Sequence, residues 1–175
     1  MKAEIRLRPV TEEDLALLHR LFSDPAATGE HEGHGWQHSQ RLRRQWDENR
    51  MLGEDGGMLM VVLGDDALGF VSWHKRSTGH PSFCWNVGIT LAPEARGHGH
   101  GTAAQQLLAR YLFAHTQVTR IEAETEITNT AEQRALEKAG FTREGVLRSV
   151  IFRHGQWRDS VIYSVLRHEV DLNRE

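Results

Sequence analysis

The order of apolar and polar side chains predicts strands and helices along this chain. Residues up to Arg8 alternate polar and apolar side chains, as a strand with one buried face does. Residues 11–22 then place leucines at helical spacing behind an acidic first turn that Thr11 would cap. Beyond a glycine-rich loop, Leu42 and Trp46 indicate a second helix. The chain is therefore expected to open with a strand and two helices.

The rest of the chain shows the same two patterns, alternation in strands and helical spacing of apolar residues. Short apolar runs predict three strands, separated by the turns Gly64-Asp65-Asp66 and Gly79-His80-Pro81, and the later segments alternate helix and strand before a closing hairpin. The expected strands are 58–63, 67–74, 82–91, 120–127, 146–153 and 157–166, and the expected helices are 102–115 and 131–139. About seven strands and four helices favour a single α/β domain over residues 1–175, with a mixed sheet covered by helices.

Composition excludes several classes of protein. The 175 residues carry 21 Lys and Arg against 24 Asp and Glu, a net charge of -3, so nothing favours nucleic acid as a partner. No apolar run reaches membrane length, and the N-terminus lacks the apolar core of a signal peptide. Cys84 is the only cysteine, which excludes an intrachain disulfide and a four-thiolate zinc site. We expect a cytoplasmic protein in which Cys84 is a small buried side chain rather than a nucleophile.

The segment Arg96-Gly97-His98-Gly99-His100-Gly101-Thr102 joins a predicted strand to a predicted helix. Such a turn places free backbone N–H groups at the positive end of the helix, which suits a pyrophosphate. The glycines let the backbone approach the phosphates, and Arg96 can add a charge-assisted contact. A tight turn without a ligand is the alternative, but three glycines at alternate positions exceed what such a turn requires.

Two nucleotide-binding motifs fit this segment poorly. A P-loop is excluded because the turn contains no Lys to reach the phosphates. Residues 99–104 match the dinucleotide fingerprint G-x-G-x-x-A, and Glu122 and Glu124 lie about as far on as a ribose-binding acid should. A doubly wound domain would continue in βαβ units, whereas the chain beyond Ala104 is short and ends in a hairpin.

A third motif matches better. Residues 87–102, in which Leu91-Ala92-Pro93-Glu94-Ala95 leads into the glycine segment, resemble the R-x-x-G-x-G signature of the GCN5-related N-acetyltransferases (GNAT). Asn129-Thr130-Ala131-Glu132-Gln133-Arg134-Ala135-Leu136-Glu137-Lys138-Ala139-Gly140-Phe141 is similar to the family's second cofactor element, in its RimJ/RimL form. Trp157-Arg158-Asp159 and Ile5-Arg6-Leu7-Arg8-Pro9 resemble that branch's closing and opening strands. The resemblance implies the GNAT fold and direct transfer of an acyl group from acetyl-CoA to a primary amine.

The resemblance also implies a cofactor site without metal. In this family the strand before the glycine segment bulges and splays from the next strand, so the backbone at Ile89, Thr90 and Leu91 should bond the pantetheine arm and polarise the thioester carbonyl. Asn129 matches a pantetheine-contacting asparagine, although a helix N-cap uses the same residue. The expected cofactor-binding residues are Ile89, Thr90, Leu91, Arg96, Gly97, His98, Gly99, His100, Gly101, Thr102, Asn129 and Lys138.

The catalytic groups depart from the family pattern. By the resemblance, Glu132 stands where the branch usually has a serine, a candidate proton donor to the departing thiolate. Leu136 stands where many relatives have a tyrosine acid. Glu132 is therefore either a protonated acid or a helix-capping residue, and the Asn-x-x-Glu pattern favours capping. Glu122, Glu124 and Glu126 share one strand face, where we expect them to approach the site or to pair with arginines of the N-terminal helices. The candidate catalytic residues are Glu126, Glu124 and Glu132.

The acceptor is expected to be a small-molecule amine or a peptide N-terminus. A pocket that includes His31, His34 and Trp36 would bind it. The histidines at 31, 34 and 38 also stand at metal-like spacing, but the glycine-rich segment fixes no geometry, so we expect no metal. Because the serine and the tyrosine are missing, a non-catalytic acyl-CoA-binding domain remains the alternative function. A nicotinamide-dinucleotide-binding protein is a less favoured alternative. A homodimer is a further expectation.

Overall fold

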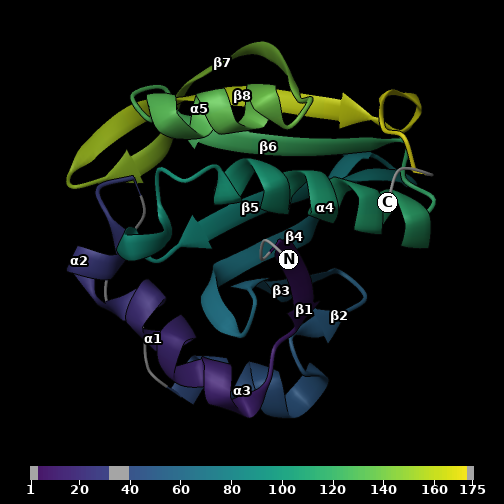
Figure 1. Cartoon of the computed structure of the whole chain (residues 1–175). Coiled ribbons are helices and arrows are strands. Elements are labelled where there is room, and N and C mark those ends of the chain that lie inside the picture. Colours follow the sequence, from purple (N-terminus) through teal and green to yellow (C-terminus); the bar gives the residue numbers. More distant parts are fainter. Residues whose placement is uncertain (1–3, 32–39, 173–175) are drawn as a thin grey trace.

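The computed structural model describes residues 4–31 and 40–172. Within them, eight strands form one sheet in the order β1-β3-β4-β5-β6-β8-β7, with β2 paired to β3 outside this path (Figure 1). The strands are β1 (Ile5–Pro9), β2 (Leu52–Gly53), β3 (Gly56–Leu63), β4 (Asp66–Gly79), β5 (Ser82–Leu91), β6 (Arg120–Glu126), β7 (Thr142–Arg153) and β8 (Gln156–Leu166). The α-helices are α1 (Leu15–Ser23), α2 (Pro25–Thr28), α3 (Gln40–Asn49), α4 (His100–His115) and α5 (Thr130–Lys138).

The sheet is mixed, as the sequence predicts. Among the described strands β5 and β6 pair in parallel, and the other pairs are antiparallel. A parallel pair needs a long crossover connection, and α4 supplies it between β5 and β6. The α/β class is therefore confirmed, and with it the rejection of a doubly wound dinucleotide fold, which would require a mainly parallel sheet.

The larger hydrophobic core lies between the sheet and helices α4 and α5 (Figure 1). Leu108 and Leu112 of α4 and Leu136 of α5 are buried there against alternate residues of the strands. On β6 these are Ile121 and Ala123, which leaves the intervening glutamates on the opposite face. The periodicity of the chain thus determines which face of the sheet is apolar.

Helices α1 and α2 cover part of the second face. Leu18 and Leu21 of α1 pack with Met60 of β3 and Phe70 of β4 in a smaller core. The side chains of β5, β6 and β8 on that same face are mostly polar. Together with the adjoining side chains of β4 and β7, we call this region the polar face. Its residues are Arg76, Cys84, Asn86, Arg120, Glu122, Glu124, Glu126, Glu144, Arg153, Arg158, Ser160 and Ser164.

Several boundaries differ from the sequence prediction. Strand β4 continues to Gly79 rather than His74, because its polar end pairs with the start of β5. A single-turn helix, α2, follows α1, since Asp24 caps it and Pro25 occupies its first position. The closing hairpin turns at His154 and Gly155, whose φ angles of 49° and 75° suit a two-residue hairpin turn.

No helix in the described ranges combines the length and the apolarity needed to cross a bilayer.

Candidate functional site

Strands β5 and β6 pair over a short stretch and then part. Their parallel register joins Trp85 to Ile121, Asn86 to Glu122 and Val87 to Ala123. Beyond it, residues 88–91 of β5 and 124–126 of β6 are no longer partners of each other, although each strand stays paired with its other neighbour. We call this opening the splay. It lies at the carboxyl ends of both strands, where open α/β sheets bind ligands.

Backbone donors of β5 point into the splay. The N–H of Ala92 donates to the carbonyl of Leu68 at 2.8 Å, on the β4 side. Because N–H directions alternate along an antiparallel strand, the N–H groups of Ile89 and Leu91 point the other way, toward β6. The register with β4 runs without a shift from Gly69 to Ser77, so the expected bulge at this point of β5 is wrong. The splay alone exposes these donors.

The glycine segment forms the turn that begins α4. Gly97 and Gly99 have φ angles of 80° and 81°, which only glycine adopts without strain, and Gly99 is the N-cap of α4. The first helical hydrogen bond runs from Ala103 N to Gly99 O at 3.2 Å. The N–H groups of His100, Gly101 and Thr102 therefore have no helical acceptor, as at any helix start.

The turn and the splay are adjacent. A side chain at Gly101 would contact the side chains of Leu91 at 3.8 Å and Ile89 at 3.9 Å. The positive end of α4 thus lies beside the strand whose amides face the splay, and an elongated ligand with a phosphate end and an amide-rich arm fits this arrangement.

The Arg96 side chain has partners within the protein. Its Nε donates to Leu91 O at 2.9 Å and its Nη2 to Ala27 O at 2.5 Å. The guanidinium therefore ties α2 to the glycine turn, a different contact from the phosphate contact predicted from the sequence. The rings of His98 and His100 stack 5.5 Å apart at the same turn.

Helix α5 supplies the second half of the expected cofactor site. Asn129 is its N-cap, and the Asn129 Oδ1 accepts from the backbone N–H of Glu132 at 3.2 Å. The carboxylate of Glu132 accepts a hydrogen bond from Gln105 Nε2 of α4. Leu136 is buried in the main core, and Lys138 lies exposed in the last turn of α5.

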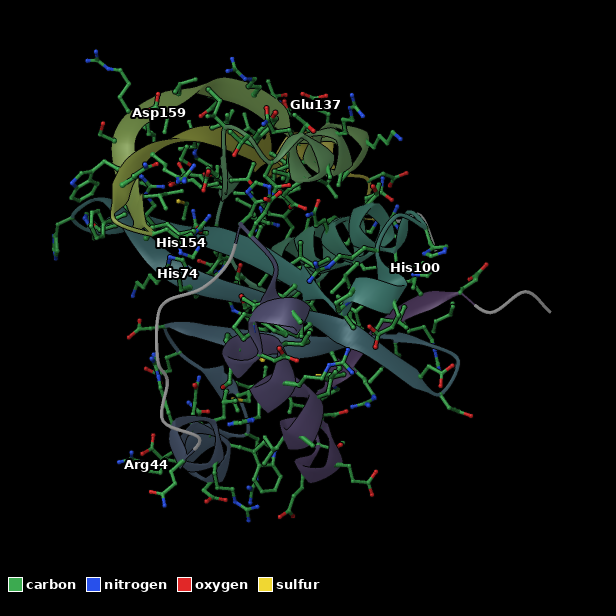
Figure 2. The ribbon with its side chains drawn as sticks, turned by 90° about the vertical axis from the view of Figure 1, so that its left-hand side faces the viewer. Arg44, His74, His100, Glu137, His154 and Asp159 are labelled. Atoms are coloured by element: carbon green, nitrogen blue, oxygen red, sulfur yellow. The ribbon has the colours of Figure 1, made fainter. Side chains whose placement is uncertain are left out.

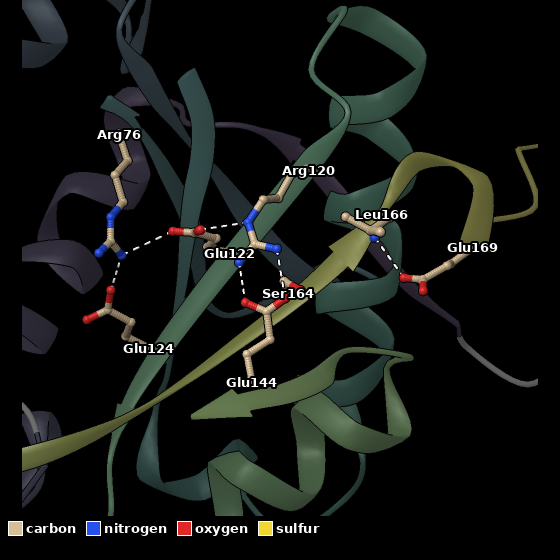
Figure 3. Close-up of polar contacts among 8 residues, drawn as sticks. All are labelled: Arg76, Arg120, Glu122, Glu124, Glu144, Ser164, Leu166 and Glu169. Carbon is tan, nitrogen blue, oxygen red and sulfur yellow. Dashed lines mark hydrogen bonds and ion pairs between the residues drawn. The ribbon is translucent and has the colours of Figure 1, made fainter. Parts of the chain in front are cut away.

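The carboxylates of the polar face pair with arginines. Figure 3 shows Arg76 between Glu122 and Glu124, and Arg120 between Glu122 and Glu144. The prediction that these glutamates pair with arginines of the N-terminal helices is wrong, since Arg76 comes from β4 and Arg120 from β6. Glu122 is 8 % exposed, whereas Glu124 keeps 26 % of its side chain open to solvent.

Glu126 is the most enclosed carboxylate of β6. Its side chain is 4 % exposed, one oxygen pairs with Arg153, and the other accepts from Arg158 at 3.2 Å and from Thr128 at 2.9 Å. Both oxygens are therefore engaged in hydrogen bonds within the protein, and three of the roughly four acceptor sites of the carboxylate are occupied.

Cys84 has the environment of a structural cysteine. It is 1 % exposed, and burial, together with the nearby carboxylate of Glu122, raises the pKa of its thiol to about 11. A thiol with so high a pKa carries little thiolate at neutral pH, so this geometry does not support a nucleophile.

The expected acceptor residues fall mostly outside the described ranges. His34, Trp36 and the histidine at 38 lie in residues 32–39, of which the structure describes nothing. His31 is described, and its Nε2 lies 3.2 Å from Glu30 Oε1. Across the described residues, no group of three or more His, Cys, Asp or Glu side chains is arranged to hold a metal ion.

Sequence reasoning missed the arginines of the polar face. Arg153 and Arg158 come from the hairpin formed by β7 and β8. Figure 2 labels two residues of this hairpin, His154 and Asp159, and shows them on the other side of the molecule from His100. The sequence held a local signal for Arg158. It lies two residues before Ser160, so the two side chains share one strand face, whereas Trp157 points to the other. The pairing with Glu126 joins distant segments and has no local signal.

Comparison with known proteins identifies this arrangement. Residues 4–142 match the family model described as an acetyltransferase (GNAT) domain. The chain belongs to the GNAT family. It is therefore an N-acyltransferase with a CoA thioester as acyl donor, and the resemblance inferred from residues 87–102 and 129–141 is confirmed.

Individual relatives agree with this assignment. An uncharacterized N-acetyltransferase of Bacillus subtilis, YnaD, is 25% identical over 123 residues, 69% of this chain and 71% of the relative. The spermidine N-acetyltransferase of Vibrio cholerae, solved with CoA and spermine, superposes with a TM-score of 0.80 at 19% identity, over 95% of this chain and 97% of that one. The ribosomal L7/L12 acetyltransferase RimL, solved with CoA, superposes with a TM-score of 0.77 at 18% identity, over 93% of both chains. At these identities the two structures establish a shared fold.

Proposed function

We propose that this GNAT enzyme transfers the acetyl group of acetyl-CoA to a primary amine of a small molecule or of a peptide N-terminus. The observation that carries the proposal is the splay of β5 and β6 beside the start of α4. The N–H groups of residues 100–102 would hold the pyrophosphate, and the amides of Ile89 and Leu91 would hold the pantetheine arm. Relatives named for spermidine and for a ribosomal protein support an amine as the acceptor.

The chemistry requires direct attack on the thioester. The amine nitrogen forms a bond to the carbonyl carbon, and the carbonyl oxygen becomes an oxyanion that an amide of β5 would stabilise more strongly than the ground-state carbonyl. The intermediate then collapses, the carbon–sulfur bond breaks, and the CoA thiolate leaves and takes up a proton. The protein must position the amine, accept its proton and exclude competing water.

Among the candidate bases, Glu124 fits the task better than Glu126. Glu124 lies level with the start of the splay on β6, and a quarter of its side chain is open to solvent. Its partner Arg76 is also partly exposed, so an amine could displace one ion-pair contact and deliver its proton to the carboxylate. The carboxylate of Glu132 points to Gln105, which supports a bracing role between helices over that of a proton donor.

A thiol-release assay tests the proposal. Purified protein with acetyl-CoA would be offered amino acids, polyamines, aminoglycosides and peptides with free N-termini, and free CoA thiol would be measured. Rapid thiol release with one class of amine is the expected result. Tight CoA binding with no thiol release for any amine would instead support a non-catalytic acyl-CoA-binding domain. This function is the second candidate because the buried Leu136 stands in place of a tyrosine. The cytoplasmic location and the homodimer stay predictions.

A further inference from the structure

The polar face carries two clusters of opposite net charge. The first contains Glu122, Glu124 and Glu144 with Arg76 and Arg120, so three negative charges meet two positive ones (Figure 3). The second surrounds Glu126, where one negative charge meets the two positive charges of Arg153 and Arg158. The strand β6 thus runs from a region with excess negative charge to one with excess positive charge, and the second region lies at the splay.

The second cluster lacks acceptors for its donors. Each guanidinium carries five N–H donors. The side chain of Arg153 is 9 % exposed, and the Nε atoms of Arg153 and of Arg158 are buried without a hydrogen-bond partner among the described residues. Glu126 and Gln156 provide the side-chain acceptors that Arg158 contacts. Buried donors without acceptors indicate a place for a further anionic group.

Arg158 is the member of this cluster that a ligand can reach. A third of its side chain is exposed, compared with less than a tenth for Arg153 and Glu126. Glu126 pairs with both Arg153 and Arg158, so the cluster keeps one excess positive charge, and its partly open member is Arg158. A planar guanidinium in this state binds a carboxylate through two parallel hydrogen bonds.

We infer that the acceptor carries a carboxylate close to its amine and that Arg158 selects it by binding this carboxylate. The inference rests on the proposed N-acetyltransferase function and specifies its substrate class: an α-amino acid or a peptide with an acidic N-terminal residue, in contrast to a polyamine. The amine lies toward Glu124 and the carboxylate toward Arg158.

The spacing of the two clusters agrees with a small zwitterion. Glu124 and Glu126 are two residues apart on β6, about 7 Å along the strand. Each charge-assisted hydrogen bond spans about 2.8 Å, so one small molecule with adjacent amine and carboxylate groups can contact both ends. A polyamine would place a second positive charge beside Arg158, which is unfavourable.

Matched pairs of amines test this inference. Thiol release from acetyl-CoA would be compared between α-amino acids and their carboxamides, and between peptides beginning with Asp and with Asn, with spermidine as the polycation. The carboxylate member of a pair is expected to have a kcat/KM at least about tenfold higher. In Arg158→Gln this ratio should fall toward one, because KM rises more for the acid than for the carboxamide.

Arg148→Gln is the matched control, because Arg148 is an exposed arginine of the neighbouring strand β7. It should keep the wild-type ratio, and thermal unfolding with CoA present would verify that both variants fold. If Arg158→Gln does not fold, Arg158→Lys keeps the charge, loses the planar fork and should give an intermediate ratio. Equal or better turnover of carboxamides or spermidine by the wild type would overturn the inference and leave the proposed function intact. Release of thiol with no amine at all would overturn both.

Discussion

Gln105 of α4 donates its side-chain N–H to the carboxylate of Glu132 on α5. Gln105 is 3 % exposed, so this hydrogen bond joins two helices below the surface, and both helices carry residues of the proposed cofactor site. Glu132, which the sequence left open as either an acid or a helix cap, thus makes a bracing contact between two helices.

Replacing Glu132 by Ala should mainly lower stability. The change leaves the buried amide of Gln105 without this acceptor, which costs about 1–3 kcal/mol of the free energy of unfolding. Urea denaturation measures that loss, and steady-state kinetics should show an unchanged kcat. Glu132→Gln retains an acceptor oxygen and serves as the control. A large fall in kcat with unchanged stability and CoA affinity would instead identify Glu132 as the acid.

Two variants of Asn129 separate helix capping from cofactor binding. Asn129→Ala removes the N-cap contact to Glu132 N and should cost about 1 kcal/mol of stability. Asn129→Asp keeps an equally good cap but loses the amide N–H donor. If Asn129 also donates to the pantetheine arm, Asn129→Asp weakens CoA binding, measured by calorimetry, at nearly wild-type stability. Wild-type CoA affinity in this variant would limit Asn129 to capping.

Gly99 should tolerate no ordinary side chain. A Cβ at this position meets no atom within 4 Å, so the cost of Gly99→Ala is conformational, about 1–2 kcal/mol for the left-handed φ of 81°. We expect lower thermal stability and weaker CoA binding, because the turn aims the first N–H groups of α4. Gly99→Asn adopts the same conformation more readily and should lose less of both. Identical CoA affinity in all three proteins would argue against phosphate binding at this turn.

Glu124→Gln should lower kcat/KM for the acceptor amine by about 100-fold, a typical contribution of a general base. Glu144→Gln is the control. Glu144 belongs to the same series of ion pairs but lies at the opposite end of that series from Glu124, where it contacts Arg120. A similar small loss in both variants would assign Glu124 to the ion pairs alone.

Glu144 should contribute stability that is lost in acid. Hydrogen bonds from Arg120 and Ser164 lower the pKa of Glu144 to about 2. A carboxyl whose pKa is lowered on folding stabilises the protein above its unfolded pKa of about 4.3, and this contribution disappears as the pH falls through about 2. Because the side chain is 39% exposed, the effect is about 1 kcal/mol or less. The stability difference between wild type and Glu144→Gln should be constant from pH 7 to 5 and shrink toward pH 2; a constant difference would contradict the assignment.

The sequence was sufficient for features that depend on neighbouring residues. The glycines at 97 and 99 signal positive φ angles, and the alternation along β6 places its glutamates on one face, because both patterns follow from local geometry. The order of the longer strands and helices and the hairpin at His154 follow in the same way, whereas the short α2 and β2 were not predicted.

Contacts between distant segments could not be predicted. Glu126 with Arg153, and Glu132 with Gln105, join residues 27 apart in the chain, and only the folded sheet and the packing of the helices bring them together. The same holds for the contact of Arg96 with the carbonyl of Ala27, a residue of helix α2, which the sequence pattern does not predict. The phosphate contact of Arg96 stays a prediction.

The short pairing of β5 with β6 also bears on the lifetime of the protein. Residues 85–87 and 121–123 are the seam between the two halves of the sheet. A CoA molecule lodged beyond that seam would contact both halves and add its binding free energy to the free energy of unfolding. Resistance to proteases should then rise with the concentration of CoA or of acetyl-CoA, since either would hold the two halves of the sheet together.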